Sequence, residues 1–322
     1  MKNLDALRGI AGAATAMCCV GTLAAVSATL RAYPVFGGQA VRYAVAAAIL
    51  FGFDGIKSRV APSTAAGAQW QRLPRRLRDW MLLTALAATG LAGFNVCVIA
   101  ATGYAGPATV GTVIATVPIL LALAVPLLAR RRPRPLLVAA AVVVATGAGV
   151  TNGLGDGSAP GLLLSLGALA GEVCFSLLAV PLLPTLGPVR VSAYSAGLAA
   201  PMLLVTGLIV DGRHVLRMPT ASEAAGLAYL GVLVTTIAFF LWYDALGRLG
   251  ADRASLFAGL IPVSAVVTTM ALGLGRPAVA DLAGAALVAV GVVVGLRPAR
   301  PREHRPARQP DPPRQADVGA AS

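Results

Sequence analysis

The sequence is poor in charged, histidine and aromatic residues. Only 12% of its 322 residues are charged, 5% are aromatic and two are histidines, whereas 57% are hydrophobic. Soluble domains carry about 25% charged residues. Apolar stretches of about 18–22 residues recur along the chain, each long enough to cross a hydrocarbon layer of roughly 30 Å. A soluble fold cannot bury that much apolar helix, so the composition indicates an all-α, polytopic membrane protein.

The scarcity of histidine and cysteine limits the chemistry that such helices can carry. His214 and His304 fall outside the apolar stretches and far apart, which leaves an intramembrane metal site or serine–histidine pair without its histidine. The cysteines fall inside the stretches, where we expect small apolar packing residues. They are Cys18, Cys19, Cys97 and Cys174. We therefore expect no enzyme activity, no cofactor, no metal and no disulfide.

The apolar stretches predict ten membrane helices. Glycine and proline inside them fit this interpretation, because neighbouring helices satisfy the backbone groups that they free. The first stretch is longer than the roughly 7–15 apolar residues of a signal peptide, so we expect it to be retained. The predicted spans are 10–30, 34–53, 79–101, 106–129, 135–151, 160–181, 191–210, 223–243, 253–272 and 278–296.

The net charge of +13 follows this topology. With both termini cytoplasmic, 21 of the 26 lysines and arginines fall on the cytoplasmic side, four fall outside and Arg42 lies within a span. This is the positive-inside asymmetry of a cell-membrane protein, so the charge indicates orientation and attraction to lipid rather than nucleic-acid binding. The segment 297–322, rich in proline and arginine, is expected to be a disordered cytoplasmic tail.

The second half of the chain repeats the first in a fixed register. Residues 100–133, AATGYAGPATVGTVIATVPILLALAVPLLARRRP, align without a gap on residues 244–277, DALGRLGADRASLFAGLIPVSAVVTTMALGLGRP. Matches of proline and glycine in a fixed register are harder to obtain by chance than matches of alanine or valine. The matched pairs include Gly103–Gly247, Pro118–Pro262 and Gly147–Gly291.

Five helices per repeat is an odd number, so the second repeat should cross the membrane in the opposite direction. We predict that residues 1–152 and 153–296 form two inverted five-helix repeats. The loop at 130–134 carries four arginines and its counterpart only Arg276, as inversion requires. Inverted repeats characterise secondary transporters, whose substrate site lies near the midplane between the repeats, although some channels share this symmetry.

Three segments resemble the EamA-type carriers of the drug/metabolite transporter superfamily. They are VRYAVAAAIL in the second predicted helix, YLGVLVTTIAFFLWYDALGRLGADRASLFAGLIPVSAVV in the eighth and ninth, and DLAGAALVAVGVVVGL in the tenth. The resemblance covers about residues 10–296. It implies a secondary transporter that exports small metabolites, amino acids or drug-like compounds by alternating access. A channel and a non-transporting membrane scaffold are the alternatives, and neither the cargo nor the oligomeric state follows from the sequence.

Arg42 lies in the middle of the predicted span 34–53. An arginine that faced lipid at this depth would cost at least about 2.5–3.5 kcal/mol, so we expect it to face the bundle interior or a water-filled cavity. Two roles are open. It either locks helices together through backbone carbonyls or an acidic partner, or it holds an anionic group such as a substrate carboxylate.

Glu172 is the second charge at this depth, in the segment GALAGEVCFSLL. That segment resembles the first helix of the small multidrug resistance proteins, which implies a glutamate that binds protons and cationic drugs. A carboxyl balanced between burial and a nearby arginine can exchange its proton. Glu172 is therefore either the exchanging group of a proton-coupled cycle or a structural partner of Arg42 or of neighbouring hydroxyls.

Five further residues are candidates for the site. Asn95 is expected to bond across helices or to cargo. Trp242 and Tyr243 are expected to anchor a helix end at the membrane interface, with stacking on substrate as the alternative. Pro118 and Pro262 are expected to kink their helices or to free carbonyls beside a central cavity.

The charge bias predicts which loops face outside. In a variant without native cysteines, single cysteines at Asp156 and His214 should react with an impermeant thiol reagent added to intact cells. Cysteines at Arg75 and Arg132 should not react. The reverse labelling pattern would contradict the predicted orientation.

Overall fold

The computed structural model consists of helices and short connections throughout its described part. It describes residues 2–23, 26, 30, 32–60, 74, 76–153, 158–271, 273, 276 and 278–297. Eight helical runs are long and apolar enough to cross a membrane, and two further apolar helices are shorter. The prediction of an all-α membrane protein is confirmed in these terms. The predicted tail lies, beyond Arg297, outside the described residues.

Within the described residues, the first half of the chain contains five long helical runs, of which the third contains a π-helical stretch, η2. The runs are α1 (Lys2–Gly21), α3 (Val35–Val60), α5 (Leu77–Ala85) with η2 (Leu86–Gly93) and α6 (Phe94–Ala101), α7 (Pro107–Ile114) with α8 (Val117–Leu128), and α9 (Pro135–Asn152).

The second half also forms five runs, and its third run contains a second π-helical stretch, η4. The runs are α10 (Ala159–Leu177), α11 (Leu183–Asp211), α12 (Ala221–Tyr229) with η4 (Leu230–Ile237) and α13 (Ala238–Leu249), α14 (Ala251–Ala254) with the 3-10 helix η5 (Ser255–Gly259) and α15 (Leu260–Ala271), and α16 (Val279–Gly295). A short 3-10 turn, η3 (Gly212–His214), follows α11, and α11 is interrupted at Gly187, where φ is 74°.

Most predicted spans agree with these runs closely at one end or both, but the first prediction, 10–30, begins eight residues too late, and its last part, 22–30, lies largely outside the described residues. The helix α1 begins at Lys2 and ends at Gly21. Its first turns are polar, so hydropathy excludes them. They fold as helix nonetheless, and Asp5 forms an ion pair of 2.9 Å with Arg248 at the end of α13.

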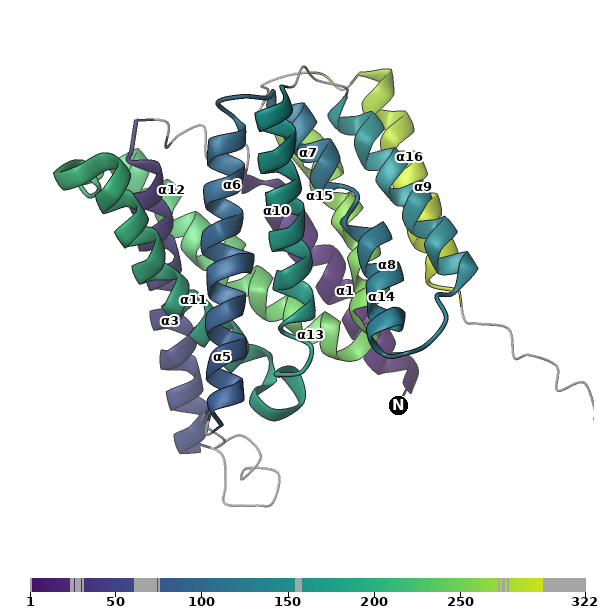
Figure 1. The fold of residues 1–322 in the computed structure, drawn as a ribbon, viewed down its shortest axis with the longest axis horizontal. Helices are drawn as coiled ribbons and strands as arrows, with labels where there is room; N and C mark the ends of the chain where they lie inside the picture. The colour runs from purple at the N-terminus through teal and green to yellow at the C-terminus, as the bar shows by residue number, and fades with distance from the viewer. Residues whose placement is uncertain are drawn as a thin grey trace, which may run out of the picture.

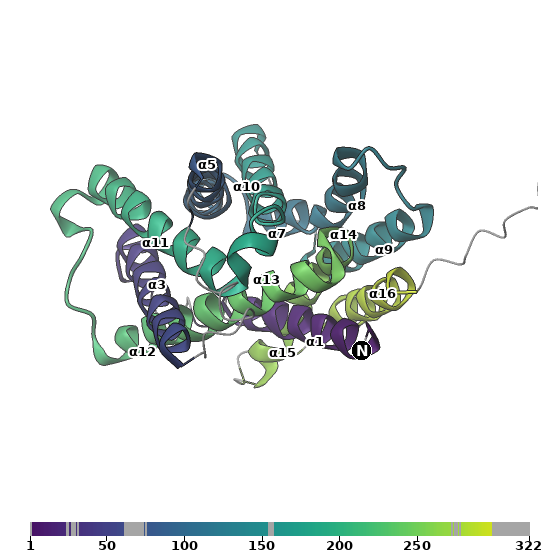
Figure 2. The same cartoon turned by 90° about the horizontal axis from the view of Figure 1, so that it is seen from below.

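The helices stand side by side in one bundle (Figure 1). Seen from below, α3 and α11 pack together on one side of the bundle, and α9 and α16 pack together on the opposite side. The helices α1, α10 and α13 lie between these two pairs (Figure 2). The largest buried cluster draws on the central helices and is rich in alanine, including Ala13, Ala46, Ala196 and Ala245. Small residues let helix backbones approach closely, which is how helices associate in lipid.

The contact between α9 and α16 depends on glycine. A Cβ atom added at Gly284 would lie 2.5 Å from the carbonyl oxygen of Gly147 and would also overlap Thr151. A Cβ atom added at Gly291 would lie 2.9 Å from the carbonyl oxygen of Ala140. Because the backbone carbonyl oxygens cannot move aside as a flexible side chain can, α9 and α16 would have to separate to admit a side chain at Gly284 or Gly291.

We expect Gly284→Ala to destabilise the folded protein by about 1–3 kcal/mol, the usual cost of overpacking. Gly247→Ala is the matched control, because a Cβ atom there meets nothing within 4 Å. Alanine should be neutral there, or stabilising by up to about 1 kcal/mol through helix propensity. Thermal unfolding of both variants in detergent measures the difference. Equal midpoints would contradict the close approach of α9 and α16.

Candidate functional site

Arg42 lies inside the bundle, as predicted, with 6% of its surface exposed. Its Nε donates a hydrogen bond to the hydroxyl of Thr235 in η4, and its Nη1 donates to Oε1 of Gln39 at 3.1 Å. The guanidinium also lies 5.2 Å from the centroid of the Tyr43 ring. The cation is therefore held by a hydroxyl, an amide and an aromatic face. Among the described residues no carboxylate forms an ion pair with it.

The π-helical stretch η4 presents the hydroxyl that Arg42 needs. Thr235 and Thr236 each donate their hydroxyl to a carbonyl five residues earlier, on Leu230 and Gly231. Thr235 can still accept the bond from Arg42, because a hydroxyl has one proton to donate and lone pairs to accept with. Gly231 lies against Val45 of α3, where an added Cβ would come within 3.2 Å. Such π-helical segments are frequent at functional sites.

Asn95 connects α6 to α3. Its Nδ2 donates to the hydroxyl of Tyr43 at 3.1 Å and to the carbonyl of Leu91, one turn earlier, at 2.8 Å. Tyr43 in turn lies under the guanidinium of Arg42. Asn95 thus bonds across helices, which is one of the two roles that the sequence left open. It also belongs to the same polar network as Arg42.

An aromatic cluster fills the space between α3, α10 and α13. The ring centroids of Phe175 and Phe239 are 5.1 Å apart, as are those of Phe175 and Tyr243, and Tyr43 lies 6.1 Å from Phe239. These rings offer an apolar, polarisable surface inside the bundle. They are 8% exposed or less, so in this conformation they pack against one another in the core.

The prediction that Trp242 and Tyr243 anchor a helix end at the interface is wrong. They are 2% and 0% exposed, and both belong to the largest core cluster. The sequence placed the end of their helix at residue 243, but α13 continues to Leu249. The two side chains therefore lie more than a turn inside the bundle and contribute to its packing.

Glu172 lies in α10, one turn before Phe175, and is half-buried. It is close enough to Tyr243 to interact with it electrostatically. In the described part of the chain, its carboxylate has no hydrogen-bond or ion-pair partner, and no ion pair joins it to Arg42. The adjacent Gly171 packs on η2, where an added Cβ would lie 2.8 Å from the carbonyl of Thr89. Without such a partner, the carboxylate of Glu172 can bind a proton or a cation.

Several buried polar groups on the neighbouring helices also have no partner among the described residues. They are the hydroxyls of Ser176 and Ser192 and the indole nitrogen of Trp242. Most buried polar groups are hydrogen-bonded, and exceptions point to strain, to water or to a function. These groups come from α10, α11 and α13, so the helices around the aromatic cluster offer hydrogen-bonding capacity that the protein itself does not use.

Pro118 and Pro262 occupy equivalent places, and both are buried. Pro118 follows the interruption between α7 and α8, and Pro262 follows η5 at the start of α15. A proline lacks the amide proton that would extend the helix backwards, which explains why each helix restarts here. The two prolines therefore mark helix breaks in corresponding parts of the two halves.

The sequence singled out Arg42, Asn95 and Glu172 as candidates but not the groups that surround them. It did not identify Gln39 or Thr235 as partners of Arg42, nor the aromatic cluster. A signal existed: Thr235 and its neighbour form a polar pair inside an otherwise apolar stretch. The bond from Thr235 to another helix requires the three-dimensional fold.

Comparison with known proteins identifies the class of protein. Residues 159–297 match the model of the EamA-like transporter family. The chain is 23% identical to Uncharacterized transporter YetK of Bacillus subtilis (strain 168) over 262 residues, which is 79% of this chain and 76% of that protein. A solved crystal structure with 22% identity has the same fold, with a TM-score of 0.72 over 91% of this chain and 97% of its own. The resemblance to EamA-type transporters is confirmed.

The Arg42–Thr235 bond makes a testable contribution to stability. Thr235→Val removes the acceptor and leaves a buried charged donor unpaired, so we expect a loss of about 1.5–3 kcal/mol. Thr236→Val is the control, because Thr236 bonds only within its own helix, and it should cost about 0.5–1.5 kcal/mol. Thermal unfolding in detergent measures both. An equal loss in the two variants would contradict the role given to Thr235.

Proposed function

We propose that this chain, whose second half matches the EamA-like transporter family, exports small metabolites, amino acids or drug-like compounds by alternating access. The observation that carries the proposal is Glu172, a carboxylate inside the bundle with no partner among the described residues. Intramembrane acids mark ion and substrate pathways. The site has no grouping of metal-ligating side chains in the described part of the chain.

We further propose that the protein crosses the membrane ten times, as inverted repeats of residues 1–152 and 153–296. The register that aligns residues 100–133 with 244–277 recurs in the helices themselves, which supports the repeat. In that register the first residues of α5, η2 and α9 coincide with the first residues of α12, η4 and α16, and the last residues of η2 and η4 also coincide. A π-helical stretch is rare, so its recurrence in register is hard to attribute to chance.

The packing of α9 against α16 supports inversion. Gly147 packs against Val288, and Gly291 packs against Val144. In the register of the repeat, Gly147 is equivalent to Gly291 and Val144 to Val288, so exchanging the two halves exchanges the two contacts. Two segments related by a two-fold axis make such pairs of equivalent contacts, because the axis exchanges the two segments. The residue numbers also run in opposite directions along the two helices, so this axis would lie in the membrane plane, as in inverted-repeat transporters.

Polar contacts between the halves occur at both ends of the bundle. At one end Arg248 pairs with Asp5, and at the other the Tyr33 hydroxyl donates to the carbonyl of Arg217 at 3.0 Å, while Arg217 donates to the carbonyl of Ala32. Alternating access requires contacts of this kind to open at one end while they close at the other. We propose that these pairs break and re-form as the repeats rock, with the Arg248 end cytoplasmic.

The chemistry of the interior indicates which cargo it accepts. The aromatic cluster provides stacking surfaces, Glu172 provides a negative charge, and the unpartnered hydroxyls provide hydrogen bonds. Arg42 is engaged by Thr235, Gln39 and Tyr43, which favours the structural role over direct binding of an anion. We therefore propose a cargo with an amine or another cationic group beside an apolar part, which competes with a proton for Glu172.

The test is Glu172→Gln, which keeps the shape of the side chain and removes its charge and its titration. The cargo is first identified by comparing the medium of cells with and without the protein, and is then studied in proteoliposomes. We expect the variant to lose accumulation driven by a pH gradient. Downhill exchange of cargo should survive, because the rocking pathway is intact.

Asp281→Asn is the control, because it removes an exposed carboxylate at the N-terminus of α16. It should transport as the unmodified protein does. Accumulation at the normal level in Glu172→Gln would contradict proton coupling through this residue. Flux far above carrier turnover without counterflow would instead identify a channel, and no flux in either direction would identify a scaffold.

A further inference from the structure

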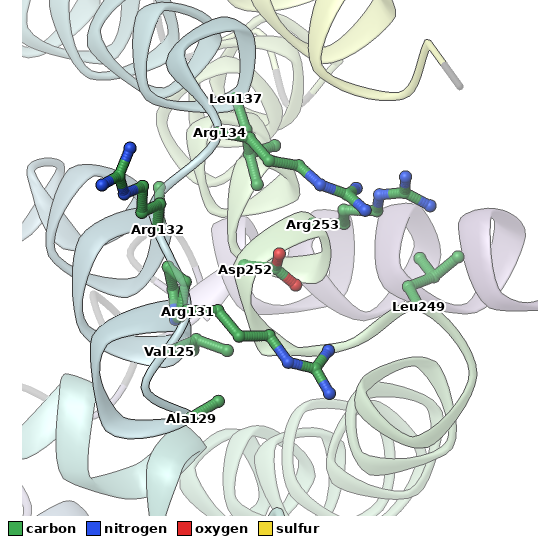
Figure 3. A pocket seen from close by; sticks show the side chains of 11 residues that line it. Val125, Ala129, Arg131, Arg132, Arg134, Leu137, Leu249, Asp252 and Arg253 are labelled. Atoms are coloured by element: carbon green, nitrogen blue, oxygen red, sulfur yellow. The ribbon is translucent and has the colours of Figure 1, made fainter. Parts of the chain in front are cut away.

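Arginine side chains surround a pocket at the end of the bundle where the N-terminus lies (Figure 1). The pocket has a volume of about 330 Å³ and lies between the α8–α9 connection and the segment that joins α13 to α14. Figure 3 shows Arg131, Arg132, Arg134 and Arg253 around it, with Asp252 among them. Its remaining lining is largely apolar and comes from α8, α9 and α13. It is distinct from the interior site around Glu172 of α10.

The pocket carries an excess of positive charge that the described part of the protein does not neutralise. Four arginines and one aspartate leave three uncompensated charges. None of these five side chains takes part in an ion pair among the described residues, whereas Arg217 and Arg248 both do. Arg131, Arg132 and Arg134 are exposed, so an anion from the aqueous side can reach this charge, and its binding would reduce the repulsion among the arginines.

The backbone of the α8–α9 connection is held in a costly conformation. Arg130 has a φ of 53°, in the left-handed region. The amide of Arg130 donates to the carbonyl of Leu127 at 2.9 Å and that of Arg131 to the carbonyl of Pro126 at 2.7 Å. These two hydrogen bonds form a Schellman motif, which ends many helices and usually has glycine at its left-handed position. Here that position is occupied by Arg130. Strain of this kind is retained mainly at functional sites.

The counterpart connection in the second half carries fewer arginines. It follows α15, has Gly273 in the left-handed conformation with a φ of 67°, and carries Arg276 as its one arginine. In the first half an arginine is left-handed, and in the second half a glycine is, one position earlier in the register of the repeat, where Gly273 is equivalent to Ala129. Helix C-termini with glycine need no ligand to explain them, so the arginines of the first half are an addition to the shared fold.

We propose that this pocket binds a phosphate group, carried either by an anionic lipid or by a soluble metabolite. The planar fork of arginine matches two phosphate oxygens at once. Arg134 is also the N-cap of α9, so the positive end of that helix dipole adds to the attraction. Basic pockets between membrane helices on the cytoplasmic side suit acidic head groups, and this pocket is cytoplasmic in the proposed orientation.

The bound phosphate connects the two halves of the chain. Arg131, Arg132 and Arg134 belong to the first half, and Arg253 belongs to the second. A phosphate held by both groups stabilises the conformation in which this end of the bundle is closed. An anion bound at the membrane surface therefore affects the rocking movement without contacting the cargo.

The test measures thermal unfolding of the full-length protein in a neutral detergent. One arm compares sodium phosphate with sodium chloride at equal ionic strength, and the other compares micelles containing phosphatidylglycerol with micelles containing phosphatidylcholine. We expect a saturable rise in the unfolding midpoint. A rise with inorganic phosphate assigns the site to soluble phosphates, and a rise with phosphatidylglycerol alone assigns it to a lipid head group.

Three variants make the result specific. The double variant Arg132→Gln, Arg253→Gln should raise the half-saturating concentration about tenfold, since each exposed ion pair contributes up to a few-fold. Asp252→Asn should lower that concentration, because it removes the one negative charge of the pocket. Arg276→Gln, the same change at the position equivalent to Arg132, should leave it unchanged.

The unfolding midpoint measured without phosphate and without phosphatidylglycerol shows whether each variant is folded. If the double variant is unfolded, Arg132→Gln alone is used in its place. The absence of a saturable rise with either probe would overturn the proposal. So would an equal response in the double variant and the unmodified protein, or an equal loss of response in Arg276→Gln.

Discussion

The buried contact between Arg42 and Thr235 is the constraint on which the interior depends. Removing a cation from water costs several kcal/mol, which must be offset by well-placed hydrogen bonds. Here the partners are neutral, and one of them is a hydroxyl presented by the π-helical stretch η4. Gly231 allows α3 to come close enough for that bond. The position of α3 in turn places Tyr43 against Asn95 and the aromatic cluster.

Because the partners of Arg42 are neutral, Glu172 is not used to balance its charge. Had Arg42 paired with Glu172, the interior would hold a closed ion pair with little capacity for cargo. Instead Arg42 is satisfied within α3 and η4, and Glu172 lies on α10 beside the aromatic cluster without a partner in the described part of the structure. This separation allows one residue to stabilise the bundle while the other is available for the transport cycle.

The sequence predicts much of the fold because the membrane restricts it. Hydropathy predicts the approximate position of the helical runs in the described part of the chain, since a span must be apolar for about 20 residues. It also places Arg42 inside, since a charge facing lipid is too costly. It misjudges α1 and α13, whose polar ends continue as helix and meet through Arg248 and Asp5. Those ends are fixed by tertiary contacts, which hydropathy does not contain. The candidate site is less predictable for a similar reason, because Thr235 lies far from Arg42 in the sequence and the π-helical stretches have no compositional signature.

The central claim is that a proton and the cargo compete for Glu172. The most direct measurement is the proton release that follows addition of the exported compound to purified protein in weakly buffered detergent solution. The account predicts release of about one proton per bound cargo at a pH where Glu172 is protonated, and none from Glu172→Gln. Binding of the cargo without proton release, or with equal release from both proteins, would contradict it.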